Sequence, residues 1–495
     1  MKDLRNNSCD DARVAVAKTP AARYPSSDNR AGSSRVNDHS AGVSGADDIA
    51  LALLRLAREL GWGDDEGGAF GHVIPKGARV LIKPNFVMHA NQGAGGIEPL
   101  VTHQSLVRAA VEAALQTGAA EVSVGDAPVQ GCDFPALLRA TGLDEWSADL
   151  MRRDSRFRGI RDFRRTIAVF KDGVRAASEN MRDESEFTLF DLGRESLLEP
   201  ITDESGAFRV TCYDPRLMRR THAPGRHQYL IARAVLDADV VINLPKLKTH
   251  KKAGITCALK NLIGINGNKE FLPHHRLGGA QSGGDCYPGA SPLKRSLEYV
   301  LDRENSTARP ALGKVWHGLG VQLGRAARIA GDGLGVEGSW SGNDTIWRTA
   351  LDLNRVLLYG RPDATFSDHP ARLVVHVADA VVAGQGDGPL APEALPMGLL
   401  VGAWNAAALD WAGAYLLGYD PARVSIAREA FGQFRWPLAT FAHEAVRLCG
   451  DLGEGAADEM FGHASAPLFQ VKHPEGWRDA AAVVAENNGA RLRSK

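Results

Sequence analysis

The chain has few cysteines, and none of them are spaced as in common metal-binding motifs. Six cysteines are spread over 495 residues. No two of them form a Cys-x-x-Cys motif, which argues against a ferredoxin-type iron–sulfur segment and against a zinc ribbon. We expect these thiols to be reduced and mostly buried. They are Cys9, Cys132, Cys212, Cys257, Cys286 and Cys449.

An excess of charge of either sign is also missing. The sequence holds 58 Lys and Arg residues against 59 Asp and Glu residues, which gives a net charge of -1. Proteins that bind nucleic-acid phosphates usually carry a basic excess, so we expect no nucleic-acid partner. The 44% hydrophobic and 24% charged residues are typical of a globular protein.

Long hydrophobic runs are absent as well. The longest apolar stretch, ALPMGLLVGAWNAAALDWAGAYLLG, is interrupted by Asp410 before it reaches the ~20 residues that a membrane span needs. The first residues, MKDLRNNSCDDAR, lack the apolar segment of a secretory signal. We therefore expect a cytoplasmic protein without a membrane span.

The hydrophobic pattern that is present predicts an α/β fold. Apolar residues recur at helical spacing over residues 47–62 and 102–119, and short apolar runs between turn residues predict buried strands. Strands alternating with helices at these lengths form parallel sheets. We expect a doubly wound, mostly parallel, Rossmann-like sheet with two long insertions. Its core strands are predicted near 13–18, 79–84, 120–125, 239–244, 372–378 and 398–402.

Composition changes along the chain suggest how the core is divided. Residues 24–47 are rich in Ser, Asn, Asp and Gly, which is typical of a mobile loop. Residues 150–228 are rich in Arg and Asp and lack a clear period. We expect a disordered N-terminus at 1–12, core segments at 13–149, 229–275 and 366–425, insertions at 150–228 and 276–365, and a C-terminal helical extension at 426–495.

Polar residues follow four of the predicted strands. In open parallel sheets the ligand crevice lies at the carboxyl ends of the strands. Lys83 and Asn85 follow the second predicted strand, and Asp126 follows the third. A lysine at the end of a buried strand is costly unless it is paired or functional. Asp379, Gly386 and Asp387 follow the strand near 372–378, the last two within a glycine-rich turn.

The densest cluster of polar groups is the segment NLPKLKTHKKAGITCALKNLIG. Lys246, Lys248 and His250 lie within five residues and are followed by two more lysines. A helix that starts at Gly254 or Thr256 would present free N–H groups to an anion, and Lys260 and Asn261 would lie on that helix. The segment predicts a pocket for a carboxylate or a phosphate, although most basic runs are solvated loops.

His274 and His275 are the only adjacent histidines in the chain. Together with His250 and an aspartate they could form a site for a divalent metal, with Asp285 as a further ligand. The alternative is that they are loop residues that hydrogen-bond to the backbone. The spacing matches no known metal motif, and the cofactor stays unknown at this stage.

Several segments together resemble the family called domain of unknown function 362. They are LIKPNF, GDAP, INLPKLKTHKKAGITCALKNLIGI, DAVVAGQGDGP and AALDWAGAYLLG, which lie between residues 13 and 425. The resemblance implies a fold and motif positions but no established reaction. Many relatives carry a ferredoxin-like segment, which this chain lacks. The resemblance therefore leaves open whether a redox partner protein supplies that segment.

These observations lead to one favoured function and two alternatives. The favoured function is an enzyme acting on an anionic small molecule, with His250, Lys248, Lys83 and Asp126 as catalytic candidates. The expected ligand-binding residues are Asn85, Lys246, Thr256, Lys260, Asn261, Asp379, Gly386 and Asp387. The alternatives are a non-catalytic binding or assembly protein for such a metabolite, and a redox or metal-dependent protein. The oligomeric state does not follow from the sequence.

Overall fold

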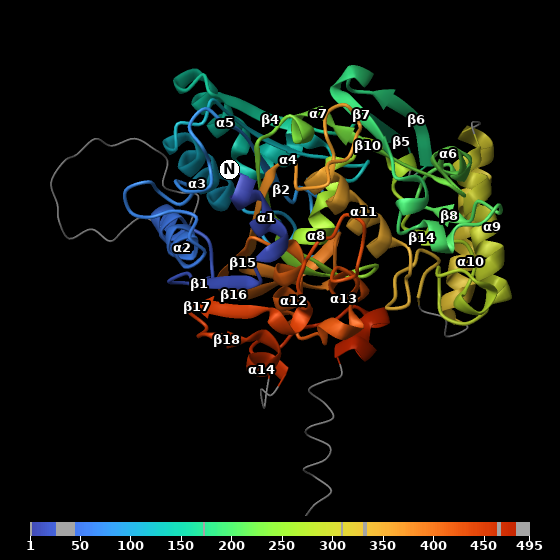
Figure 1. Cartoon of the computed structure of the whole chain (residues 1–495). Coiled ribbons are helices and arrows are strands. Elements are labelled where there is room, and N and C mark those ends of the chain that lie inside the picture. Colours follow the sequence, from blue (N-terminus) through green and yellow to red (C-terminus); the bar gives the residue numbers. More distant parts are fainter. Residues whose placement is uncertain are drawn as a thin grey trace, which may run out of the picture.

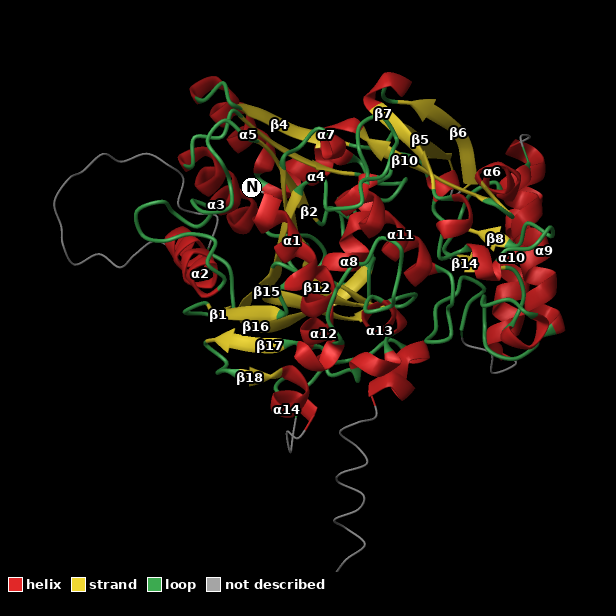
Figure 2. Ribbon diagram, viewed as in Figure 1, coloured by secondary structure: helices red, strands yellow, loops and turns green. Residues whose placement is uncertain are grey.

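A computed structural model describes residues 2–25, 45–171, 174–307, 310–329, 334–462 and 467–481. One sheet of eleven strands runs through the molecule, and Figures 1 and 2 show helices packed on both sides of it. The strand order is β18-β17-β1-β16-β15-β11-β2-β3-β4, and β12 and β13 join beside β15. This arrangement confirms the predicted α/β class.

The sheet is mostly parallel. Strands β15, β11, β2, β3 and β4 are parallel neighbours, and only the pairings of β16, β13 and β18 with their neighbours are antiparallel. The strands are β1 (Arg13–Lys18), β2 (Arg79–Pro84), β3 (Glu121–Asp126), β4 (Phe157–Asp162), β11 (Val240–Leu244), β12 (Lys246–His250), β13 (Gly254–Thr256), β15 (Leu373–Asp387), β16 (Ala391–Ala403), β17 (Arg447–Gly450) and β18 (Gly455–Ala456).

Alternate residues of the central strands pack into two separate hydrophobic cores, one on each face of the sheet. In β2, Val80 and Ile82 join the core under helices α2 and α3, whereas Leu81 joins the core under α11 and α12. This alternation follows from the two-residue period of a strand. The helices of the two layers are α2 (Gly45–Glu59), α3 (Gln104–Gln116), α4 (Phe134–Thr141) and α5 (Leu143–Arg153) on one side, and α1 (Lys2–Asp10), α11 (Ile346–Tyr359), α12 (Ala406–Leu416) and α13 (Ser425–Glu429) on the other.

Two additions stand outside this three-layer body. The first contains the hairpin β5 (Thr166–Lys171) and β6 (Val174–Asn180), a small antiparallel sheet, and helices α6 (Pro215–Thr221) and α7 (Arg233–Leu236). The small sheet joins β7 (Phe187–Asp191), β10 (Arg226–Ala232) and β9 (His222–Ala223). The second holds the helical hairpin α9 (Pro292–Ser306) and α10 (Pro310–Ile329), and β8 (Phe208–Arg209) pairs with β14 (His275–Arg276) between the two additions.

The predicted boundaries need four corrections. Residues 1–12 contain helix α1, whose Ser8 Oγ donates a hydrogen bond to the Val374 carbonyl at 3.0 Å. Strand β4 lies in the predicted insertion at 150–228 but pairs with β3 in the main sheet. Helix α11 lies in the predicted insertion at 276–365 but packs in the core. The predicted helical extension contributes β17 and β18 to the sheet, followed by α14 (Ala457–Gly462).

The N-terminal loop falls partly outside the described residues. Residues 26–44 of the expected mobile loop at 24–47 belong to that part, whereas Tyr24 is buried and Gly45 already begins α2. Among the described residues, no helix is both long enough and apolar enough to cross a bilayer.

Candidate functional site

The carboxyl ends of β2 and β3 bring Lys83 and Asp126 into a buried ion pair. The Lys83 Nζ lies 2.7 Å from Oδ1 of Asp126, and both side chains are almost fully buried. The backbone N–H of Phe86 donates to Oδ2 of Asp126 at 2.6 Å. Burial lowers the pKa of Lys83 and raises the pKa of Asp126, and each charge opposes the shift of its partner.

Asn261 connects this ion pair to the neighbouring strands. Its Oδ1 accepts hydrogen bonds from Asn85 Nδ2 at 2.9 Å and from Lys83 Nζ at 3.3 Å. Its Nδ2 donates to Asn243 Oδ1 at 2.7 Å, and Asn243 Nδ2 contacts Nδ1 of the buried His376 at 3.0 Å. Asn243 and His376 were not predicted, because a polar residue inside an apolar strand gives no sign of its partner.

Lys246 and Asp379 form a second buried ion pair at 2.7 Å. Tyr24 donates from its hydroxyl to Oδ1 of Asp379 at 2.5 Å and accepts a hydrogen bond from Lys246 Nζ at 2.6 Å. The backbone N–H of His103 donates to Oδ2 of Asp379 at 2.8 Å, and its ring stacks on Tyr24. The nearby Lys248 Nζ donates to the Leu100 carbonyl. Other groups of the protein therefore bind the predicted ligand-binding residues Lys246 and Asp379 and the predicted catalytic residue Lys248.

The basic segment is not the loop and helix that the sequence suggested. Lys246–His250 form strand β12, which is buried throughout, and Gly254–Thr256 form strand β13. The helix that follows, α8 (Ala258–Asn261), is a single turn. The predicted anion site at a helix N-terminus starting at Gly254 or Thr256 is therefore wrong, whereas the basic side chains do lie at the carboxyl edge of the sheet.

A cavity of about 680 Å³ opens beside this edge. It lies between the strand ends and the first addition, and residues from both additions contribute to its wall. Eight predicted residues line it, namely Asn85, Asp126, His250, Thr256, Lys260, Asn261, His274 and Asp387. The remaining predicted residues are not part of its lining, namely Lys83, Lys246, Lys248, Asp379, Gly386, His275 and Asp285.

Gly264 allows the cavity wall to approach the first ion pair. A Cβ atom at this position would lie 1.9 Å from Oδ1 of Asp126 and 2.9 Å from Nζ of Lys83. Its carbonyl also accepts a hydrogen bond from the Ala127 N–H at 2.9 Å. Only a residue without a side chain fits between the pair and the cavity.

Lys260 is a cationic residue in the lining of the cavity. Among the described residues, its Nζ has neither a hydrogen bond nor an ion pair. Burial, together with the charges of Lys252 and Lys83, lowers its pKa from 10.5 to about 7. Arg164, by contrast, is paired with Asp162, and Lys252 lies 3.7 Å from Glu337.

Two histidines of the cavity lining differ in which ring nitrogen carries the proton. Nδ1 of His250 accepts hydrogen bonds from the N–H groups of Lys252 at 3.0 Å and Ala253 at 3.2 Å, so the proton of the neutral ring is on Nε2. Nδ1 of His274 donates to the Leu272 carbonyl at 2.7 Å, so its Nε2 is an acceptor. Burial lowers the pKa of both rings well below the usual value, and neighbouring lysines add to the shift.

The predicted metal ligands do not come together. Asp285 accepts hydrogen bonds from Thr345 Oγ1 at 2.6 Å and from the Asp344 N–H at 3.0 Å, next to the start of α11. His275 pairs with Arg209 in the β14–β8 ladder. Within the described part of the chain, no three His, Cys, Asp or Glu side chains form a group that could hold a metal ion.

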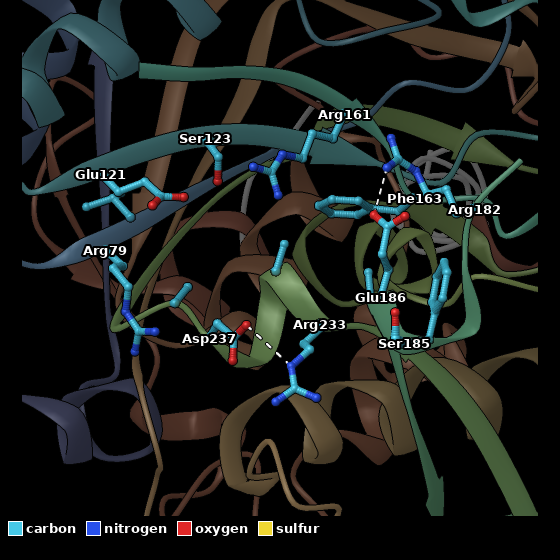
Figure 3. Close-up of a pocket in the computed structure, with 15 residues that line it drawn as sticks. Arg79, Glu121, Ser123, Arg161, Phe163, Arg182, Ser185, Glu186, Arg233 and Asp237 are labelled. Carbon is cyan, nitrogen blue, oxygen red and sulfur yellow. Dashed lines mark hydrogen bonds and ion pairs between the residues drawn. The ribbon is translucent and has the colours of Figure 1, made fainter. Parts of the chain in front are cut away.

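A second pocket, of about 320 Å³, lies on the face of β2, β3 and β4 (Figure 3). None of the predicted site residues line it. Arg182 pairs with Glu186 at 2.8 Å, and Arg233 lies 3.7 Å from Asp237. Because its cations are largely matched by carboxylates, this pocket is a weaker anion site than the cavity at the strand ends.

The fold and the cavity define an α/β protein with a lysine- and histidine-lined cavity at the carboxyl edge of a mostly parallel sheet. The chain belongs to the family described as Domain of unknown function (DUF362), whose model matches residues 80–171 and 180–415. No curated protein matches the chain. Among solved structures, it is similar to a structural-genomics protein from Thermotoga maritima, with 11% identity and a TM-score of 0.29. That match covers 74% of this chain and 58% of the other.

Proposed function

We propose that the protein is an enzyme that acts on a small anionic molecule, a carboxylate or a phosphate, in the cavity at the strand ends. The observation that carries the proposal is the Lys260 amino group, which faces the cavity without a protein acceptor among the described residues. An anion beside it would relieve the repulsion from Lys252 and Lys83 and would favour the charged form of the lysine.

The two histidines supply the acid–base part of the proposal. His250 would donate from Nε2–H to an oxygen that gains negative charge, and His274 would accept a proton on Nε2. The carboxylate of Asp126 lies in the same wall but is held by Lys83, so it would act by orienting that wall rather than by taking a proton. Lys83 and Lys248 would hold the strand ends in place.

The binding step is tested with inorganic phosphate and a panel of small carboxylates in titration calorimetry. We expect Lys260→Met to lose binding of the ligand that the wild type retains, and Lys76→Met, which alters an exposed lysine outside the cavity, to bind normally. Equal binding by both variants would contradict the proposed role of Lys260.

The pH dependence of binding gives a second readout of Lys260. Its pKa is about 7 in the empty cavity, so the lysine is charged below pH 7 and loses its proton above it. Affinity for a carboxylate, whose own charge is constant in this range, should fall by up to about tenfold per pH unit above 7, with proton uptake on binding. Calorimetry of the wild type in buffers of different ionisation enthalpy measures both effects, and an affinity that stays constant from pH 6 to pH 9 would contradict the role of Lys260.

Turnover separates the enzyme from a non-catalytic binding protein. We expect His250→Gln and His274→Gln to keep ligand binding and to lose product formation, followed by nuclear magnetic resonance over hours with the ligands that bind. Saturable binding by the wild type without any product would favour the binding protein instead.

A further inference from the structure

The α9–α10 hairpin forms an outer face of the molecule that the anion cavity does not use. Figure 1 shows both helices at the edge of the molecule, away from the central sheet. They pack on a small separate core that includes Tyr287, Leu297 and Val336. Asp302 of α9 also joins the hairpin to Arg209 of β8, and part of the hairpin surface is exposed to solvent.

Apolar side chains are exposed along one face of α10. Leu312, Val315 and Leu319 are 45%, 64% and 44% exposed, and Ile329 at the end of the helix is 88% exposed. Positions 312, 315 and 319 follow one another at the spacing that places residues on a single helix face. We call these four side chains the α10 apolar strip. Exposing contiguous apolar side chains to water is unfavourable, and such a surface is typical of an interaction site.

The charges of α10 indicate which kind of partner. The helix PALGKVWHGLGVQLGRAARI contains lysine, histidine and arginine but no Asp or Glu. On a helical projection, Arg325 lies beside the apolar strip, and Arg328 lies farther round the helix. Arg325 and Arg328 have no carboxylate partner among the described residues.

The acidic residues of the neighbouring helix are engaged within the protein. Glu304 of α9 pairs with His317 at 3.1 Å, and Asp302 of α9 pairs with Arg209 at 2.9 Å. The carboxylate of Glu298 accepts a hydrogen bond from the Gly278 N–H at 2.7 Å. Glu304 therefore offsets His317 of α10 itself, whereas none of these three carboxylates pairs with Arg325 or Arg328 among the described residues.

We infer that α10 binds the surface of an anionic lipid membrane. An amphipathic helix with a basic polar face lies in the plane of the interface, with its apolar side chains among the lipid chains and its cations at the headgroups. Charge complementarity favours this occupant over a second copy of the chain, whose own α10 would present the same positive charge. The inference is independent of the anion cavity and of its chemistry.

Sedimentation of the full chain with vesicles tests the inference. Vesicles of phosphatidylcholine with and without phosphatidylglycerol are compared at low and at physiological salt. We expect binding that requires phosphatidylglycerol and weakens with salt. The double variant Val315→Ser, Leu319→Ser and the double variant Arg325→Gln, Arg328→Gln should each weaken it by about tenfold.

Matched controls change the same residue types elsewhere on the surface. Leu51→Ser together with Met151→Ser alters exposed apolar residues on α2 and α5, and Arg152→Gln together with Arg153→Gln alters exposed arginines on α5. We expect the controls to bind vesicles like the wild type, with all variants melting within a few degrees of it.

Two results would overturn the inference. The first is vesicle binding by the α10 variants that equals that of the controls. The second is no vesicle binding by the wild type, and a dimer in sedimentation velocity that the α10 apolar variant converts to a monomer would then show that the strip is an interface between copies.

Discussion

Lys83 and Asp126 are each costly to bury alone, and each is stabilised by the other. Lys83→Met would leave the Asp126 carboxylate buried without its cation. We expect this change to lower the free energy of unfolding by about 3–5 kcal/mol, because breaking a buried pair leaves an uncompensated charge. Urea unfolding followed by circular dichroism measures it, with Lys76→Met as the exposed control. Similar midpoints for the two variants would show that the pair is not ionised.

Asp410 predicts a pH dependence of stability. Its carboxyl is fully buried, Oδ2 has no hydrogen-bond partner in the described residues, and burial raises its pKa from 3.8 to about 7. Because the folded-state pKa is the higher one, the stabilising protonated form is fully present below pH 3.8 and is lost as the pH rises to 7.

The Asp410→Asn variant isolates this effect. Relative to the variant, the wild type should lose up to about 1.4 kcal/mol of unfolding free energy per pH unit within that window. Above pH 7 the difference should become constant. Urea unfolding of both proteins from pH 4 to pH 8 measures it, and parallel stability curves would contradict the raised pKa.

The residues of the candidate site differ in how well the sequence identifies them. Lys260 and His250 were predicted because they belong to a dense basic segment, and both line the cavity. Lys246 and Lys248 belong to the same segment, yet their amino groups are bound by Asp379 and by a carbonyl far away in sequence. Spacing along the chain shows which residues are near one another, but it does not show which of them find a partner.

At the level of elements, the close approach of Gly264 to β3 gives a matched pair of glycine substitutions. Gly264→Ala would place a Cβ atom 1.9 Å from the Asp126 carboxylate, whereas a Cβ atom at Gly318 on α10 meets nothing within 4 Å. We expect Gly264→Ala to destabilise the fold by about 1–3 kcal/mol and Gly318→Ala to stabilise it by about 0.5–1 kcal/mol. Thermal unfolding of both variants tests this, and the expected result is a lower melting temperature for Gly264→Ala and a higher one for Gly318→Ala.

The predicted elements succeed where apolar residues alone determine them. Strands β2 and β11 contain runs of Val, Leu and Ile, β3 contains two buried valines, and all three lie where the sequence placed them. Strand β12 was missed because KLKTH has no apolar run, and it is buried only because Lys246 pairs with Asp379 on β15. Helix α1 was missed for a similar reason, since its sequence is mostly polar and only Ser8 and Cys9 are buried, with Leu4 partly buried.

At the level of the whole molecule, the C-terminal segment extends the sheet and hydrogen-bonds to Lys251 and Gly386 from outside the cavity. Strand β17 pairs with β1, Trp477 Nε1 donates to the Lys251 carbonyl at 2.6 Å, and the Gly386 N–H donates to the Lys472 carbonyl at 2.7 Å. These contacts join the two ends of the chain through one core. The family match ends at residue 415, before this segment begins.

Truncation tests whether the C-terminal segment belongs to the same cooperative unit. A chain that ends at Val424 should fail to unfold cooperatively, because it exposes the core that Leu448 and Trp477 help to cover. A chain that ends at Ala481 keeps every described element and should melt like the full chain. Differential scanning calorimetry compares the three proteins. A sharp transition in the shorter chain would show that the segment is an independent addition.

The Lys246–Asp379 pair also constrains how this sequence can diverge. The two residues are 133 positions apart, yet each would be left as a buried, uncompensated charge if the other were replaced. A single substitution at either position therefore destabilises the fold, and the ion pair can be replaced only when both residues change together. During evolution we therefore expect positions 246 and 379 to be either both retained or both substituted, although they are far apart in the sequence.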